Sequence, residues 1–380
     1  MQHKKKILLI MKHDITLYPP VISLCNILVT LGYEVLYIGA CSSMHVKQSL
    51  QSLGVKLYIQ DQYHGNALKR FTQQLTFRKR VKKIIEKEYS ENTYLWFIHF
   101  ETALLFIKSF DTHRCIAHLL EFRDADLNFG YKLLTGFCDY KAKLAKARKI
   151  ICCEYNRAHI TQALFCLKEL PVVLPNKPFQ IQSGNESEEV PAIVTTLKKQ
   201  YKNKKIILYQ GAFQPERQLD KFFEAIGKLP DEYVFFLMGS SNDYQKNLKE
   251  KYENQRNIFV PFLPPPLHLY ITEMAHIGIL AYNSLGKNIG QMINVLYCAP
   301  NKIYEYSKFG IPMIANDLPA LKFAFTENKA GIALPDPLTA QSIISTIKTI
   351  DSDYSKYKEE SKRLYNNIDM VQIVENIIES

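Results

Sequence analysis

Short apolar runs alternate with longer amphipathic segments along the whole chain, as expected for the strands and helices of an α/β protein. The first run, residues 6–11, predicts a strand that is buried on both faces of a parallel sheet. A helical segment follows at residues 20–31 and ends at Gly32. Further strands of the first half are predicted at residues 34–38, 57–59, 95–99, 115–119 and 150–153, with helices between them that include residues 69–87 and 136–147.

The same alternation starts again in the second half of the chain. Strands are predicted at residues 205–210, 234–238, 258–262, 277–282 and 311–315, and helices at residues 217–229, 302–308 and from about 318 to 331. Strands and helices that alternate in this way form doubly wound parallel sheets with right-handed crossovers. We therefore expect an α/β protein with two Rossmann-like, doubly wound parallel-sheet domains that face a central cleft.

The segment 171–178, PVVLPNKP, predicts the boundary between the two domains, because its prolines interrupt both helices and strands. The predicted domains are residues 1–172 and 191–368, joined by a linker at residues 173–190. The last residues, 369–380, predict a helix that either crosses back to the first domain or simply ends the chain.

The formal net charge of +11 lies in the first part of the chain, where residues 1–170 contain 25 Lys and Arg against 14 Asp and Glu. Its densest part is residues 69–87, KRFTQQLTFRKRVKKIIEK, in which apolar residues recur at helical spacing among the cations. Such a basic amphipathic helix is compatible with a solvated surface helix or with a surface that binds anionic lipid headgroups. No nucleic-acid recognition motif accompanies it, so nucleic acid is not an expected partner.

The composition is that of a globular protein, since 47% of the 380 residues are hydrophobic and the chain is long enough for two cores. Eight cysteines include no CxxC pair and no metal-ligand spacing, so we expect buried free thiols. No apolar stretch reaches the roughly 18 residues needed to span a bilayer. We expect a cytoplasmic protein that the basic segment would allow to attach to the inner face of the plasma membrane.

The segment 300–315, PNKIYEYSKFGIPMIA, carries the most informative pattern. It predicts a helix that stops at Gly310 and is followed by the strand 311–315. Glu305 lies inside this helix, which packs beside the carboxyl end of a strand, where open α/β sheets bind ligands. A carboxylate at this place can accept hydrogen bonds from two neighbouring hydroxyls of a ligand.

This segment resembles the donor-nucleotide motif of GT-B glycosyltransferases, in particular retaining glycosyltransferase family 4 of the bacterial surface-polysaccharide type. In that motif, as here, PNK is followed by an apolar residue, an aromatic residue and Glu-Tyr, and then by Gly-x-Pro. The resemblance implies the GT-B fold and a Glu305 that holds the nucleotide ribose. It also places Asn301 and Lys302 on the donor side.

Three other strand ends of the second half resemble the same family. Gly211 would let a phosphate approach the backbone, and Arg217 would bind the phosphate at the mouth of the following helix. Gly239 and the backbone near Leu263 would lie against the nucleotide base, although no side chain separates UDP from GDP or ADP.

Two positions depart from the family pattern. Ala212 stands where the family has an Arg, and Tyr297 stands eight residues before Glu305, where the family has a Glu that engages the donor sugar. We keep Tyr297 among the donor-side residues. The two departures leave open a non-catalytic subunit of the same fold.

The first half contributes three further candidates. The run WFIHFE predicts a strand that ends in His99 and Glu101, and the resemblance implies a catalytic role for both residues, since the family often has a His or an acidic residue there. A structural histidine is the alternative for His99. Glu121 matches an acidic position after the next strand in the family, which implies a residue on the acceptor side.

The resemblance implies a glycosyltransferase that takes sugar from a nucleotide-diphosphate sugar, with a UDP sugar favoured, and passes it to a glycan or a lipid-linked acceptor. It implies polysaccharide synthesis, such as that of a capsule, with retention of configuration and without a metal or other cofactor. The string Asp124-Ala125-Asp126 lies outside the predicted donor half, and we interpret it as chance. A nucleotide-sugar 2-epimerase of the same fold is the alternative enzyme.

Overall fold

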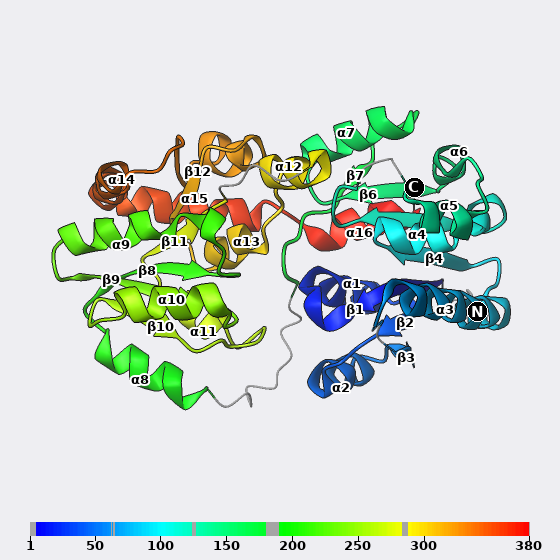
Figure 1. Cartoon of the computed structure of the whole chain (residues 1–380), viewed down its shortest axis with the longest axis horizontal. Helices are drawn as coiled ribbons and strands as arrows, with labels where there is room; N and C mark the ends of the chain where they lie inside the picture. The colour runs from blue at the N-terminus through cyan, green and yellow to red at the C-terminus, as the bar shows by residue number, and fades with distance from the viewer. Residues whose placement is uncertain are drawn as a thin grey trace. The chain divides into compact units, whose positions relative to one another are not determined.

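The computed structural model describes residues 5–61, 63, 65–123, 127–179, 190–282 and 288–379. The chain divides into two compact units. The first unit contains Met1–Gln182 together with Asp369–Ser380, and the second contains Ser183–Ile368 (Figure 1). Much of the predicted linker, and the string at residues 124–126, lie outside the described residues.

The first unit is built on a parallel sheet of seven strands in the order β3-β2-β1-β4-β5-β6-β7. Its strands are β1 Lys6–Asp14, β2 Glu34–Ala40, β3 Lys56–Ile59, β4 Thr93–Ile98, β5 Cys115–Leu119, β6 Lys149–Cys152 and β7 Val172–Val173. Its helices are α1 Pro19–Thr30, α2 Met44–Ser52, α3 Ala67–Glu88, α4 Phe100–Leu105, α5 Phe129–Thr135, α6 Tyr140–Leu144, α7 Tyr155–Phe165 and α16 Met370–Glu379, with 3₁₀ turns at Ile15–Leu17 and Ile107–Asp111.

The second unit is built on a parallel sheet of six strands in the order β10-β9-β8-β11-β12-β13. Its strands are β8 Lys205–Gln210, β9 Tyr233–Met238, β10 Asn257–Val260, β11 Ile277–Leu280, β12 Met313–Asn316 and β13 Gly331–Leu334. Its helices are α8 Ala192–Gln200, α9 Leu219–Lys228, α10 Asp243–Tyr252, α11 Leu269–Thr272, α12 Ile289–Leu296, α13 Asn301–Lys308, α14 Ala340–Ser352 and α15 Tyr354–Asn366, with 3₁₀ turns at Pro215–Arg217 and Pro319–Leu321 and a π-helical turn at Phe323–Glu327.

Both faces of the second sheet are covered, as the apolar character of its strands predicts. Successive residues of β8 enter different cores: Ile206 packs with residues of α8 and α13, whereas Ile207 packs with residues of α9 and α14. Because side chains alternate between the faces of a strand, the two cores lie on opposite faces. This confirms the prediction of parallel α/β sheets in both halves of the chain.

The last helix, α16, belongs to the first unit. Its residues Val374, Ile377 and Ile378 are buried, and the hydroxyl of Tyr94 donates a hydrogen bond of 3.3 Å to the carbonyl of Ile378. The chain therefore returns to its first sheet after the second unit is complete.

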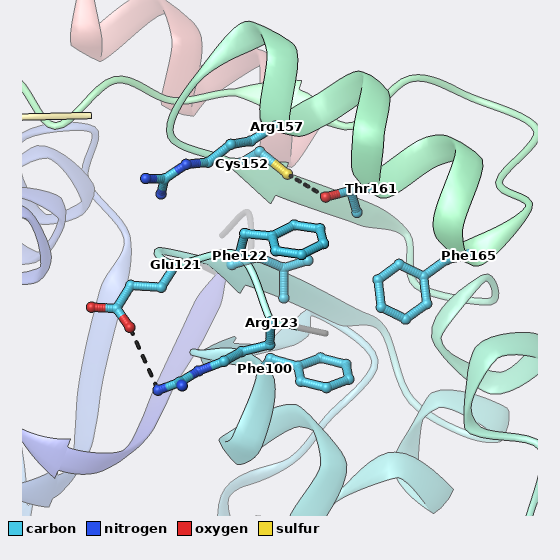
Figure 2. Close-up of a pocket in the computed structure, with 9 residues that line it drawn as sticks. Phe100, Glu121, Phe122, Arg123, Cys152, Arg157, Thr161 and Phe165 are labelled. Atoms are coloured by element: carbon cyan, nitrogen blue, oxygen red, sulfur yellow. Dashed lines mark hydrogen bonds and ion pairs between the residues drawn. The ribbon is translucent and has the colours of Figure 1, made fainter. Parts of the chain in front are cut away.

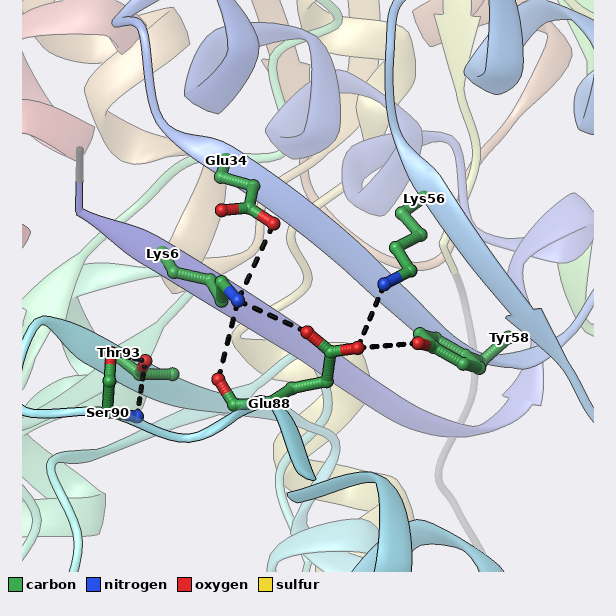
Figure 3. Close-up of polar contacts among 7 residues, drawn as sticks. All are labelled: Lys6, Glu34, Lys56, Tyr58, Glu88, Ser90 and Thr93. Atoms are coloured by element: carbon green, nitrogen blue, oxygen red, sulfur yellow. Dashed lines mark hydrogen bonds and ion pairs between the residues drawn. The ribbon is translucent and has the colours of Figure 1, made fainter. Parts of the chain in front are cut away.

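The basic segment forms the helix α3, as predicted, and Glu88 fixes the end of this helix to the sheet (Figure 3). The carboxylate of Glu88 accepts hydrogen bonds from Lys6 at 3.1 Å, from Lys56 at 2.8 Å and from the hydroxyl of Tyr58 at 2.7 Å. These contacts, led by those with Lys56 and Tyr58, lower the pKa of Glu88 to about 2. The carboxylate consequently stays charged and holds the helix against β1 and β3.

Three local predictions were wrong. The helix expected at residues 136–147 is replaced by α5 and α6, because Gly136 adopts a left-handed conformation and ends α5. The helix expected from Arg217 begins at Leu219, and the one expected after residue 318 is reduced to two short turns.

Candidate functional site

Glu305 lies in α13 of the second unit, and its carboxylate is held by two neighbouring side chains. The amide of Gln210, at the end of β8, donates a hydrogen bond of 2.6 Å to Oε2 of Glu305. The Nε2 atom of His268 lies 3.3 Å from the other oxygen. Thr272 donates a hydrogen bond of 2.8 Å to the amide oxygen of Gln210, which turns the amide nitrogen of Gln210 towards Glu305. Each carboxylate oxygen keeps a lone pair that can accept a further hydroxyl.

Close packing against β11 sets the position of α13. The ring of Tyr306, the next residue after Glu305, lies so close to Gly278 that a Cβ atom there would be 2.6 Å from the ring. The hydroxyl of Tyr306 donates a hydrogen bond of 3.0 Å to the carbonyl of Leu208 in β8. The helix is thus locked to two adjacent strands, with Glu305 at their carboxyl ends.

Two cations lie over the same aromatic ring beside Glu305. The Nζ atom of Lys302 is 5.1 Å from the centroid of the Tyr282 ring and donates a hydrogen bond of 3.2 Å to its hydroxyl. The guanidinium of Arg217 lies 4.3 Å from the same centroid and donates a hydrogen bond of 2.8 Å to the carbonyl of Ala281. Burial lowers the pKa of Lys302.

Neither Lys302 nor Arg217 forms an ion pair with a carboxylate among the residues that the structure describes. Buried charges are normally paired, because the cost of desolvation is otherwise not recovered. Lys302 and Arg217 are both part-buried and lack such a partner in the described part of the chain, so together they define a candidate anion-binding site. This is the arrangement that a diphosphate would complete.

Gly211 borders this cation pair. Its φ of 140° is a conformation that side-chain-bearing residues rarely adopt, and a Cβ atom at this position would lie 2.7 Å from Nζ of Lys302. Gly239, at the end of the neighbouring strand, is equally close to Gly211, since a Cβ atom on it would be 2.0 Å from the carbonyl oxygen of Gly211. The structure therefore brings together five of the predicted donor residues, which are Gly211, Arg217, Gly239, Lys302 and Glu305.

The other predicted donor residues take different places. Asn301 begins α13, directly before Lys302. Leu263 is buried in the apolar core that lies against α8 and α13, and Tyr297 at the end of α12 packs against the same core. Arg217 does not open α9 as predicted: it ends the 3₁₀ turn before this helix, and Gln218, with a left-handed φ of 50°, separates the two.

In the first unit, His99 directly follows β4 as a strained residue. The prediction that this residue lies within the strand was wrong. Its φ is 71°, an uncommon value for a residue with a side chain, and its Nε2 atom is buried without a hydrogen-bond partner in the described structure. The ring lies 4.8 Å from the ring of His13 and 4.6 Å from that of Tyr18. Burial lowers the pKa of His99 to about 2 and that of His13 to about 4, so both imidazoles are neutral near pH 7.

Glu101, in the first turn of α4 and also outside the predicted strand, is connected to Glu121 through an arginine. The Nε atom of Arg123 lies 3.0 Å from Glu101, and its Nη2 atom lies 3.5 Å from Glu121. Nearby, Lys12 of β1 donates a hydrogen bond of 2.6 Å to the hydroxyl of Tyr131 in α5. Opposite charges are thus balanced in this cluster.

Glu121 and Arg123 also line a small pocket together with Arg157 and several apolar side chains (Figure 2). The pocket encloses about 10 Å³, which is room for about one water molecule. It is too small for a sugar, so it does not itself constitute an acceptor site.

Several residues of these clusters were not expected from the sequence. They are Lys12, His13, Tyr18, Arg123, Gln210, His268, Thr272 and Tyr282. Gln210 and Tyr282 each lie at the end of a predicted strand, so the rule that ligands bind at carboxyl ends of parallel strands was a signal for both. His268 and Thr272 lie in a proline-rich turn and a short helix, whose contact with Glu305 depends on long-range packing.

Comparison with known proteins finds a family match for the second unit. Residues 196–369 match the family model described as glycosyl transferases group 1. No curated protein matches the chain significantly.

Among the described residues, no group of three His, Cys, Asp or Glu side chains is placed to hold a metal ion.

The fold is shared with solved structures over nearly the whole chain. Anabaena HepE, crystallised with UDP, is 16% identical with a TM-score of 0.66 and 98% coverage of both chains. A glycosyltransferase from Rickettsia africae is 14% identical with a TM-score of 0.67, over 98% of this chain and 94% of that one. A Listeria monocytogenes putative UDP-N-acetylglucosamine 2-epimerase is 10% identical with a TM-score of 0.59, over 95% and 91% of the two chains.

These likenesses establish the GT-B fold, with two Rossmann-like parallel-sheet domains. Together with the family match, they support a glycosyltransferase of this fold. No helix in the described part of the chain has the length and apolar character needed to cross a membrane.

Proposed function

We propose that the protein transfers a sugar from a nucleotide-diphosphate sugar, with UDP as the favoured nucleotide, and that the second unit binds the donor. The observation that carries this proposal is the pair of cations, Lys302 and Arg217, that converge over Tyr282 without a carboxylate partner in the described structure. Glu305 lies three residues after Lys302 on the same helix and offers its free lone pairs to a ribose diol. HepE, which has the same fold, was crystallised with UDP and with UDP-glucose.

The cations also compensate for the arginine that the family has at position 212 and this chain lacks. The leaving diphosphate gains negative charge as the glycosidic bond breaks, and fixed positive groups stabilise this charge in the transition state. Lys302 reaches the surface of Gly211, next to Ala212, so its ammonium can supply the contact that an arginine at position 212 would make.

We further propose that transfer retains the anomeric configuration without a metal, as the resemblance to glycosyltransferase family 4 implies. In such a mechanism the departing phosphate oxygen takes the proton of the attacking acceptor hydroxyl, and no side chain has to act as a base. This fits the histidine of the first unit, because a His99 whose pKa is lowered to about 2 is a weak base near pH 7 but can still donate or accept a hydrogen bond. Its role is then to bind a sugar hydroxyl.

The acceptor proposed for the first unit is a glycan or a lipid-linked sugar in the synthesis of a surface polysaccharide, such as a capsule. The basic helix α3 supports an acceptor at an anionic membrane, since its exposed side chains are mostly cationic. Glu101 and Glu121, held by Arg123, are candidates for hydrogen bonds to acceptor hydroxyls.

A panel of UDP, GDP, ADP and CMP sugars tests the proposal. Thermal shift of the purified chain measures binding, and release of free nucleotide measures turnover by slow hydrolysis or by transfer. We expect one nucleotide sugar to bind and to be turned over. Binding without turnover would instead identify a non-catalytic subunit, and the Tyr297 that stands in place of the family's Glu would explain it. Interconversion of the sugar without transfer would identify an epimerase.

A further inference from the structure

The helix α5 of the first unit has an exposed apolar face that no described part of the chain covers. Phe129 is 72% exposed, Leu133 is 49% exposed and Phe137, just after the helix, is 65% exposed. Phe129 and Leu133 are four residues apart and thus share one side of the helix. The rings of Phe129 and Phe137 lie 6.3 Å apart, so the three side chains form one continuous patch.

The opposite side of α5 faces the candidate site of the first unit. Leu134 is buried in the core, and the hydroxyl of Tyr131 accepts the hydrogen bond from Lys12. Tyr131, Glu101 and Arg123 belong to neighbouring elements at the carboxyl ends of the strands. The helix therefore connects the exposed apolar patch with the residues proposed to bind the acceptor.

The basic helix α3 adjoins α5. Arg78 of α3 donates a hydrogen bond of 2.9 Å to the carbonyl of Leu134. On the same flank of α3, a stripe with seven-residue spacing contains Leu68, which is 74% exposed, Leu75, which is 43% exposed, and the exposed Lys82. Two adjacent helices thus carry exposed large apolar side chains.

The helix α3 also carries many exposed cations. The exposed charged residues of α3 are Lys69, Arg70, Lys79, Arg80, Lys82, Lys83 and Lys87, against the single exposed carboxylate of Glu86. Lys132 of α5 is also exposed. Aromatic and leucine side chains flanked by lysine and arginine are the composition of surfaces that insert partly into an anionic bilayer, where apolar burial and headgroup attraction add.

We infer that Phe129, Leu133 and Phe137 insert into the surface of an anionic lipid bilayer, while the cations of α3 bind its headgroups. We call this surface the α3–α5 face. The inference deepens the proposed function, because it rests on the proposal of a membrane-borne acceptor and identifies α5 as the element that joins the bilayer to the acceptor residues. A second protein copy would match the apolar side chains but not the cations of α3, which would repel their equivalents.

Vesicle sedimentation tests the inference with the full chain. The probes are vesicles of phosphatidylcholine alone and of equal parts phosphatidylcholine and phosphatidylglycerol. We expect the protein to sediment with the anionic vesicles only. We expect Phe129→Ser/Phe137→Ser to weaken this binding by about tenfold or more, because the variant lacks the two aromatic side chains that the bilayer would bury. Lys79→Glu/Lys82→Glu should weaken it by a similar factor and increasingly so at low salt.

Two control variants match these changes elsewhere on the surface. Met44 is 64% exposed and Ile289 is 66% exposed, so Met44→Ser/Ile289→Ser removes two equally exposed apolar side chains. Lys348→Glu/Lys358→Glu reverses two exposed lysines of the second unit. Both controls should bind vesicles like the unaltered chain.

Equal vesicle binding by Phe129→Ser/Phe137→Ser and the unaltered chain would overturn the inference, as would no binding of the unaltered chain to anionic vesicles. Size-exclusion chromatography without lipid gives a third outcome: a dimer that this variant dissociates would show that the face binds a second copy. Thermal shift with UDP separates the two proposals. A variant that still binds UDP but not vesicles supports the inference, and a chain that binds vesicles but no nucleotide contradicts only the proposed donor site.

Discussion

The side-chain amide of Gln210 donates a 2.6 Å hydrogen bond to the carboxylate of Glu305, and this contact joins the end of β8 to the helix α13. The amide cannot rotate freely, because Thr272 donates to its oxygen. Glu305 is therefore oriented before any ligand binds. A polar side chain that is already held in place loses less conformational entropy when a ligand binds, so binding costs less free energy.

The first prediction concerns Glu305 itself. Glu305→Ala should weaken UDP binding by about 1.5–3 kcal/mol, since hydrogen bonds to a charged group are lost. Gln210→Leu should weaken it less, because the carboxylate remains but is no longer oriented. Isothermal titration calorimetry measures both, with the exposed Glu359→Ala as the control. Unchanged affinity in Glu305→Ala would remove this residue from the site.

The second prediction concerns the stability of the protein without ligand. Lys302 is a part-buried cation that has no ion pair in the described structure, and desolvation lowers its pKa, so its charge opposes folding. Lys302→Met should raise the free energy of unfolding by about 1 kcal/mol or more, although the same change should weaken UDP binding. Urea unfolding measures the change against the exposed Lys322→Met. A destabilised Lys302→Met protein would show that the lysine serves the fold and not an anion.

The third prediction concerns the packing of α13. Gly278→Ala places a methyl group 2.6 Å from the buried ring of Tyr306, which has no room to move. We expect a loss of about 1–3 kcal/mol in stability, as is usual for overpacking, and weaker UDP binding because α13 carries Glu305. Gly227→Ala is the matched control, since a methyl group there meets nothing within 4 Å. Equal melting temperatures for the two variants would contradict the packing argument.

The fourth prediction concerns pH. Burial lowers the pKa of His118 to about 3 in the folded protein, below the unfolded value of about 6.5, so the unfolded state binds the proton more tightly. Stability from this neutral histidine is complete above about pH 6.5 and is lost as the pH falls towards 3. His118→Phe should reduce the loss of stability between about pH 7 and about pH 5 by about 2 kcal/mol. Urea unfolding at the two pH values measures it, and the exposed His159→Gln should leave the loss unchanged.

The sequence predicted both parallel sheets, because alternating apolar runs and amphipathic segments report local periodicity. It also proposed Glu305, Lys302 and Gly211 as donor-side residues, because they lie at the ends of strands or in a compact motif. It did not predict that Arg217 would lie before its helix, since this depends on the left-handed conformation of Gln218. The contacts of His268 with Glu305 and of Arg123 with Glu101 join residues that are far apart in the chain. Periodicity contains no information on such contacts.

The central claim, that Lys302 and Arg217 form a diphosphate site, is tested most directly by titrating UDP and uridine into the unaltered chain and into Lys302→Met/Arg217→Met. Charge-assisted hydrogen bonds to phosphate are each worth about 1.5–3 kcal/mol, so the account predicts that UDP binds the unaltered chain at least tenfold more tightly than it binds the variant. Uridine, which lacks phosphate, should bind both proteins equally. Equal UDP affinity for the two proteins would contradict the account.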